Sequence, residues 1–451
     1  MIHCYKLNGF NIVLDSASGS IHSVDDVAYD AIRMFESAGK EETLKHIIGT
    51  FDDITEPEAW QLLSDIEELR RLGKLYTADR ISAADVKERR APLKALCMNV
   101  SHMCNMVCDY CFAGKGDYGG GGLMPFETGK RAVDFLVKNS GDRTNLYIDF
   151  FGGEPLMNWG VVKEIVGYAR SLEQDAGKRF SFTLTTNGLL IDDDVIEFSN
   201  KEMDNVVLSL DGRPEVNDHS RKLAAGGGSY SKIVPKFSRF VKEREGKEYY
   251  IRGTYTRRNL DFVNDILHLA DLGFNMISME PVVSPQGAPN GLGHDCLPAL
   301  SEQYELLARK MIRRKKEGRG FTFYHYMLDL TGGPCVYKRI AGCGAGTEYL
   351  AVTPGGQLYP CHQFVGNPAF LMGDVSAGVT NEKLRGEFRG CSIYSRAQCR
   401  ECWAGMYCSG GCAAGAYNAS GSISGVYELG CELFKKRVEC AVMMKVANVV
   451  F

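Results

Sequence analysis

Short apolar stretches alternate with helix-length amphipathic segments through the middle of the chain. The apolar stretches cover residues 95–100, 146–151, 180–185, 205–210, 249–255 and 276–283. Between them, segments such as 128–138 and 161–172 carry apolar residues at helical spacing. This alternation predicts a parallel α/β sheet or barrel. Six repeats are fewer than the eight of a complete TIM barrel, so we expect a partial (β/α)6 barrel.

Polar motifs stand where the predicted strands end. They occupy residues 152–154, 185–188, 209–212, 254–256 and 280–281. In parallel α/β barrels the carboxyl ends of the strands form the mouth of the active site. Any one polar turn is ordinary, and Asp211-Gly212 alone also suits a β-turn. Their shared position at one end of the barrel predicts a site there.

The first ninety residues have a different pattern. Short strands are expected within 1–14 and 21–23, followed by helices over 24–37 and 42–50. Thr55 and Glu58 form a capping box that opens a third helix, which ends near Leu72. This order predicts a winged-helix-like unit over residues 1–80, with a packing extension as the alternative. The third helix carries more acidic than basic residues, which disfavours DNA binding.

The remaining boundaries follow from composition. A charged, alanine-rich stretch at 81–92 is the expected linker, the barrel covers 93–320, and a cysteine-rich domain covers 321–451. The 451 residues carry a net charge of −4, which gives no electrostatic reason to expect nucleic acid or a membrane surface. No apolar run approaches the roughly 18 residues that span a bilayer, and no signal peptide is evident. We expect a cytoplasmic protein.

The 16 cysteines add evidence about bound cofactors. Reducing thiol pools disfavour disulfides in a cytosolic protein, so metal or cluster ligation is the better explanation. Cys104, Cys108 and Cys111 form a C-x3-C-x2-C motif, with Tyr110 just before the last cysteine. Three thiolates hold a [4Fe–4S] cluster by three of its irons and leave the fourth open. Zinc or scattered core cysteines are the alternatives, but zinc ligands usually come as two close pairs.

The C-x3-C-x2-C motif and the later run Gly152-Gly153-Glu154-Pro155-Leu156 together resemble the radical S-adenosylmethionine (SAM) superfamily. The resemblance implies that the amino and carboxylate groups of SAM bind the open iron. An electron would then split SAM into methionine and a 5′-deoxyadenosyl radical. The fold implied is the partial (β/α)6 barrel expected above.

The resemblance also implies roles for single residues. Glycine backbone and a carboxylate would meet the SAM amino group, an arginine would pair with its carboxylate, and an aromatic residue would meet adenine. The SAM-binding residues expected on this basis are Tyr110, Gly152, Gly153, Glu154, Asn187, Ser209, Asp211 and Arg221. No catalytic residue is assigned beyond the SAM cluster.

The C-terminal cysteines resemble the SPASM domain, which carries two auxiliary [4Fe–4S] clusters in peptide-modifying enzymes. By this resemblance Cys399, Cys402, Cys408 and Cys431 hold one cluster, and Cys343, Cys361 and Cys412 hold the other. A zinc ribbon is the competing interpretation. Two complete clusters need eight ligands, and Cys335 is a candidate for the eighth. Alternatively, the fourth iron is open and binds a substrate thiolate.

The order of the three parts resembles the maturases of SCIFF (six cysteines in forty-five residues) peptides. This implies a RiPP recognition element that binds the leader of a cysteine-rich precursor as an added strand, and an enzyme that forms a Cys thioether crosslink. A flavodoxin or ferredoxin would supply electrons. Two other enzyme classes stay open: a sulfatase maturase that makes formylglycine, and another SPASM peptide-modifying enzyme. A non-enzymatic electron carrier is the third alternative.

Overall fold

We describe a computed structural model of the chain, which covers residues 1–78, 91–285, 287–328 and 340–450. Most of the expected linker, and Cys335, lie outside the described residues. Within the described ranges, none of the helices combines the length and the apolar character needed to span a bilayer.

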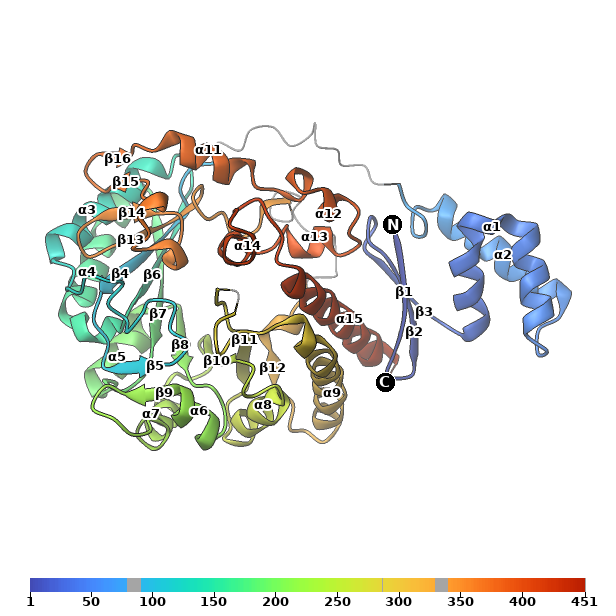
Figure 1. Cartoon of the computed structure of the whole chain (residues 1–451), viewed down its shortest axis with the longest axis horizontal. Coiled ribbons are helices and arrows are strands. Elements are labelled where there is room, and N and C mark those ends of the chain that lie inside the picture. Colours follow the sequence, from blue (N-terminus) through green and yellow to red (C-terminus); the bar gives the residue numbers. More distant parts are fainter. Residues whose placement is uncertain (79–90, 286, 329–339, 451) are drawn as a thin grey trace.

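A mostly parallel sheet forms the centre of the molecule (Figure 1). The strands β4, β6, β7, β8, β10 and β11 lie side by side in this order, all parallel. Their bounds are Ala95–Ser101, Asn145–Gly152, Arg179–Thr186, Asn205–Ser209, Tyr249–Tyr255 and Met276–Pro281. These are the six strands expected from the sequence. Side chains such as Leu96, Ile148 and Phe182 are fully buried in the sheet.

Helices connect these strands and cover the outer face of the sheet (Figure 1). They are α3 (Phe126–Asn139), α4 (Trp159–Ala176), α5 (Asp193–Glu202), α6 (Pro214–Ser220), α7 (Tyr230–Glu243), α8 (Phe262–Asp271) and α9 (Leu297–Lys316). Among the described residues the two outermost strands of the sheet do not pair with each other. The barrel is therefore open, which leaves one side to be closed by the C-terminal part of the chain.

The central sheet continues into that C-terminal part. β12 (Thr322–Phe323) pairs with β11, and β13 (Tyr349–Val352) pairs with β4 on the opposite side. Antiparallel β14 (Gln357–Tyr359), β15 (Gly373–Asp374) and β16 (Gly378–Val379) extend this edge. The sheet therefore passes across the domain boundary expected at residue 320.

Short helices follow, and one long helix ends the chain. They are α11 (Glu382–Gly390), α12 (Ala397–Arg400), α13 (Gly405–Cys408), α14 (Ala413–Ser420) and α15 (Glu428–Val450). Single 3-10 turns occur at η2 (Pro155–Asn158), η3 (His294–Cys296), η4 (Tyr324–Tyr326), η5 (His362–Phe364), η6 (Pro368–Phe370) and η7 (Ile393–Ser395). α15 lies against α9 and against the N-terminal sheet (Figure 1).

The N-terminal unit begins with three antiparallel strands. They are β1 (Ile2–Leu7), β2 (Phe10–Asp15) and β3 (Ser20–Val24), with β2 in the middle. The first two join through Asn8-Gly9, whose φ angles of 51° and 85° suit a type I′ hairpin turn. This Asn-Gly pair is a strong hairpin signal that divides the stretch 1–14.

The helices of the N-terminal unit also follow the expected pattern. α1 (Asp26–Thr50) is interrupted at Gly39, where φ is 78° and ψ is 174°, so it forms two helical halves. α2 (Glu56–Arg71) has the predicted capping box, because the backbone N–H of Thr55 donates to Glu58 Oε2 over 2.8 Å.

The N-terminal unit rests on α15. The imidazole of His3 stacks on Trp403 with 3.8 Å between ring centroids, and its Nε2 lies 3.0 Å from Glu439 Oε1. The hydroxyl of Tyr5 donates to the Glu439 carbonyl. Arg309 of α9 donates to Asn8. The contacts of Glu439 hold β1 against α15, and the contacts of Trp403 and Arg309 join the N-terminal unit to other parts of the molecule.

Candidate functional site

The carboxyl ends of the central strands open into a cavity of about 200 Å³. All but one of the expected SAM-binding residues line it, together with the three cysteines of the first motif. These lining residues are Cys104, Cys108, Cys111, Tyr110, Gly152, Gly153, Glu154, Asn187, Ser209 and Arg221. The structure thus brings together residues from five separate segments of the chain, as the strand-end pattern predicts.

A short antiparallel pair positions the cysteine loop. β5 (Met106–Cys108) pairs with β9 (Arg221–Leu223), which sets Cys108 opposite Arg221. Burial raises the pKa of Cys108 to about 12, and the nearby thiols of Cys111 and Cys104 add to this rise. Asn187 Nδ2 lies 3.7 Å from Cys104 Sγ. The three thiols therefore form one group.

The two glycines after β6 allow main-chain segments to approach closely. A Cβ on Gly152 would lie 2.2 Å from the carbonyl oxygen of Ser101, and the φ of Gly152 is +131°. A Cβ on Gly153 would lie 2.3 Å from the carbonyl oxygen of Met103. No side chain fits at either position. The backbone of this segment therefore lies directly against the cysteine loop.

Glu154 is buried, with 1 % of its surface exposed. Its Oε1 accepts from Thr186 Oγ1 and from the Leu156 N–H, and its Oε2 accepts from the Asn187 N–H. Burial raises the pKa of the Glu154 carboxyl, although these three donors act in the opposite direction. An ionised carboxylate has about four acceptor positions. One position therefore remains for a donor in the cavity.

Asp211 differs from its expected place, because it lies behind the cavity wall. It is fully buried, and its carboxylate accepts from the Tyr110 hydroxyl over 2.6 Å and from the Thr254 N–H over 3.0 Å. Arg221 Nη1 donates to the same Tyr110 hydroxyl. Asp211 therefore orients Tyr110 and Arg221 instead of lining the cavity. The buried Nε of Arg221 has no hydrogen-bond partner among the described residues.

These features fit SAM and a [4Fe–4S] cluster. Three thiols of one group match the three irons that need a protein ligand. The unpartnered guanidinium Nε of Arg221 suits a carboxylate, and the free acceptor position of Glu154 suits an ammonium group. Gly152 and Gly153 line the cavity beside these groups, so their backbone can contact a ligand there.

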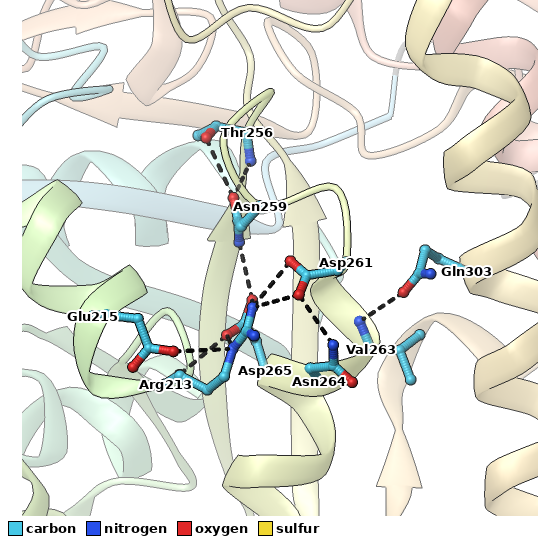
Figure 2. A network of polar contacts seen from close by, with 9 residues as sticks. All are labelled: Arg213, Glu215, Thr256, Asn259, Asp261, Val263, Asn264, Asp265 and Gln303. Carbon is cyan, nitrogen blue, oxygen red and sulfur yellow. Dashed lines mark hydrogen bonds and ion pairs between the residues drawn. The ribbon is translucent and has the colours of Figure 1, made fainter.

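A polar network around the buried carboxylate of Asp265 follows Asp211 in the chain (Figure 2). Arg213, which follows Asp211 by two residues, donates through Nε to Asp265 Oδ1 over 2.7 Å and through Nη2 to Asp261. Asn259 donates to the other oxygen of Asp265. A Cβ on Gly212 would lie only 2.2 Å from Asp265. The network therefore fixes the segment after β8 against α8.

Replacement of Arg213 by methionine should destabilise the protein by about 3 kcal/mol, because the Asp265 carboxyl has no exposed surface and would lose its cation. Chemical denaturation measures the change. Arg239→Met is the matched control, since Arg239 pairs with Asp193 and Glu243 at the surface; its cost should stay below about 1 kcal/mol. If the two substitutions lower the free energy of unfolding equally, the network does not stabilise the protein as expected.

The electrostatic neighbours of two buried C-terminal cysteines are members of the groups expected by resemblance, while the cluster assignment itself stays a prediction. Burial raises the pKa of Cys361 to about 12, and Cys412 and Cys343 raise it further. Burial likewise raises the pKa of Cys408 to about 12, with added effects from its neighbours Cys431, Cys399 and Cys402. Such mutual effects require that the thiols of each group lie close to one another.

A site for a single metal ion needs a tighter arrangement of ligands than a cluster site does. Within the described ranges, no three His, Cys, Asp or Glu side chains are placed to hold one metal ion together. A cubane cluster instead takes one cysteine at each iron, so its ligands stand farther apart. Cys391 is not among the expected cluster ligands; its thiol lies 3.7 Å from the Ile423 carbonyl oxygen, and it lines a small pocket together with Cys343. Cys335 lies outside the described residues.

Residues 98–244 match the model of the Radical SAM superfamily. This match covers the cysteine motif, the glycine pair and Arg221. The chain carries a radical SAM domain. Most residues that line the cavity lie within the matched region, and the others, such as Arg252, Glu280 and His362, come from later parts of the chain.

The chain is also similar to enzymes that are named as maturases. The mycofactocin maturase MftC of Mycolicibacterium smegmatis is 26% identical over 335 residues, which are 72% of this chain and 79% of MftC. A cysteine-type anaerobic sulfatase-maturating enzyme of Clostridium novyi is 23% identical over 344 residues, 71% of this chain and 87% of that enzyme.

Two solved structures share the fold of the radical SAM chain. The anSMEcpe structure with bound AdoMet has a TM-score of 0.66 at 21% identity and covers 80% of this chain and 100% of that one. Streptococcus suis SuiB bound to the precursor peptide SuiA has a TM-score of 0.53 at 16% identity, covering 94% and 97%. The α/β fold with a mostly parallel central sheet is therefore confirmed.

Several residues of the radical SAM cavity were not predicted from the sequence. Phe112, Phe151, Arg252 and His362 line it. His362 comes from the C-terminal part, and burial lowers its pKa to about 4. Arg252 is a charged residue inside an otherwise apolar strand, which is the signal that would have identified it. His362 directly follows Cys361, but only the tertiary fold places it at the cavity.

Proposed function

We propose that this protein is a radical SAM enzyme that forms a Cys thioether crosslink in a ribosomally made, cysteine-rich precursor peptide. One combination supports the proposal: the cysteines expected to form three groups occur in one chain with an N-terminal sheet whose strand β3 pairs only with β2 among the described residues. The peptide maturases among its relatives support the substrate class.

The cofactors follow from the cysteine groups. Cys104, Cys108 and Cys111 hold the SAM-binding [4Fe–4S] cluster. Two auxiliary clusters are held by Cys343, Cys361 and Cys412 and by Cys399, Cys402, Cys408 and Cys431. When bound, SAM and the clusters supply a radical that removes a hydrogen atom from the peptide and accept the electron released as sulfur bonds to carbon.

The residues around the cavity orient SAM. Glu154 accepts from its amino group beside the backbone of Gly152 and Gly153, and Arg221 donates from Nε to its carboxylate. Ser209 and Asn187 complete this wall. The backbone of Tyr110 meets the adenine, while its side chain stays bonded to Asp211 and Arg221. Asp211 acts through these two residues as a positioning group.

The N-terminal unit binds the leader of the precursor. β3 pairs only with β2 among the described residues, so its outer edge is free to accept a strand. β1, at the other edge, rests on α15. Fluorescence anisotropy of a labelled leader peptide tests this assignment, and a leader that fails to bind the protein would contradict it.

Mass spectrometry of the precursor tests the proposed reaction. After incubation with the reconstituted enzyme, SAM and a flavodoxin or ferredoxin as reductant, the precursor should lose two hydrogen atoms, and one thiol should resist alkylation. An aldehyde in place of a cysteine or serine would instead identify a formylglycine-forming enzyme, the second candidate that the Clostridium novyi relative favours. An unchanged precursor would overturn both.

The proposal includes two further assignments. We place the enzyme in the cytoplasm, where thiols stay reduced. The first auxiliary cluster has either Cys335 as its fourth ligand or an open iron that binds the substrate thiolate, and we favour the open iron.

A further inference from the structure

A second, larger groove adjoins the cavity. It has a volume of about 680 Å³, compared with about 200 Å³ for the cavity, and the two share Val283 in their walls. The segment after β11 forms one side of the groove, and α14 with the start of α15 forms the other (Figure 1). Its volume lies in the range of well-formed ligand sites.

The walls of the groove are rich in small residues. Gly291, Gly293 and Gly415 contribute backbone, and Ala288 and Ala419 contribute only methyl groups. Small residues let the backbone of a ligand approach the backbone of the protein. Main-chain hydrogen bonds are the usual source of affinity for an extended peptide. The groove is therefore suited to a peptide more than to a compact, highly charged metabolite.

The charged side chains of the groove are already engaged. Arg257 pairs with Asp295 over 2.6 Å and donates to the Gly291 carbonyl over 3.2 Å. His294 lies 3.8 Å from Glu428. Apolar surface comes from residues such as Leu292 and Tyr427. An uncharged segment with small and apolar side chains matches this surface better than an acidic or basic one.

The position of the groove also matters. α14 begins directly after Cys412, and Cys431 stands in the first turn of α15, two residues after Leu429. This wall of the groove therefore lies between Cys412 and Cys431, which belong to different expected cysteine groups. The groove therefore starts at the cavity and passes between the segments that follow Cys412 and precede Cys431, although neither cysteine lines it.

We propose that this groove binds the core of the precursor, meaning the cysteine-containing segment that is modified, while the N-terminal unit binds the leader. This inference rests on the proposed function and adds a second peptide site to it. Leader and core thus contact separate parts of the molecule, joined by α15.

A photo-crosslinking residue tests the groove directly. p-Benzoylphenylalanine at position 419, on the exposed last turn of α14, should crosslink to the core segment of the precursor. The same residue at position 377, exposed in the turn between β15 and β16, is the control and should give no crosslink to the core. Peptide mapping identifies the crosslinked segment.

Affinity measurements give a second readout. Ala419→Trp fills the groove and should weaken binding of the full precursor at least about tenfold, or 1.4 kcal/mol. It should leave leader-only binding and iron content unchanged, and Ala377→Trp should change none of these. Wild-type affinity in Ala419→Trp, or crosslinks at 419 that map to the leader alone, would overturn the inference while leader binding kept the proposed function intact. A wild-type protein that binds neither peptide would overturn both.

Discussion

Replacement of Cys104, Cys108 and Cys111 by alanine is expected to abolish 5′-deoxyadenosine formation. All three thiols line the cavity that Glu154 and Arg221 also line, so removing them removes the only ligands proposed there for the SAM cluster. Without an iron open to SAM, no radical can form. Chromatography of the reaction mixture under reducing conditions measures the nucleoside.

Cys4→Ala is the matched control for this loss. Cys4 lies in β1 of the N-terminal unit and belongs to none of the three groups, so its replacement should leave deoxyadenosine formation unchanged. Iron analysis adds a readout that does not depend on turnover, since the triple variant should bind about four irons fewer per chain. Deoxyadenosine at the wild-type level in the triple variant would contradict this site assignment.

Replacement of Cys408 by alanine is expected to remove the thioether product while part of the SAM cleavage continues. Cys408 is grouped with Cys399, Cys402 and Cys431, and this group stands apart from the SAM cavity. The variant should therefore lose one auxiliary cluster, with iron falling from about twelve to about eight per chain. Deoxyadenosine formed without crosslinked peptide is the expected signature.

Cys391→Ala is the corresponding control in the same domain. Cys391 contacts the Ile423 carbonyl and is not among the expected cluster ligands, so iron content and product should both be retained. If Cys408→Ala makes the full amount of crosslinked peptide with its iron unchanged, the auxiliary cluster assignment is wrong. The two cysteines differ mainly in their neighbours, which makes the pair informative.

The central fold and most of the cavity follow from local sequence patterns. Six apolar stretches became six neighbouring parallel strands, and parallel strands bring their carboxyl ends to one edge. That rule alone places Gly153, Asn187 and Ser209 around one cavity, although they lie far apart in the sequence. The grouping of the C-terminal cysteines rests instead on resemblance and stays a prediction.

Side-chain direction after a strand ends was harder to predict. Ser209 faces the cavity, and a strand continued for two residues would point Asp211 to the same side. β8 ends at Ser209, however, so the alternation of the strand does not continue, and Asp211 contacts Tyr110 and Thr254 instead. His362 reaches the cavity only because β13 joins β4 across the open side of the barrel.

The length of α15 indicates how far apart the two proposed peptide sites lie. Leu429 lies at the groove and Glu439 holds β1, ten residues or about 15 Å apart along the helix. The free edge of β3 lies two strand spacings farther, about 10 Å. An extended chain needs roughly eight residues to cover this distance. Under the proposed function, cysteines fewer than about eight residues from the leader would not reach the groove, and the enzyme would modify only those farther along the precursor.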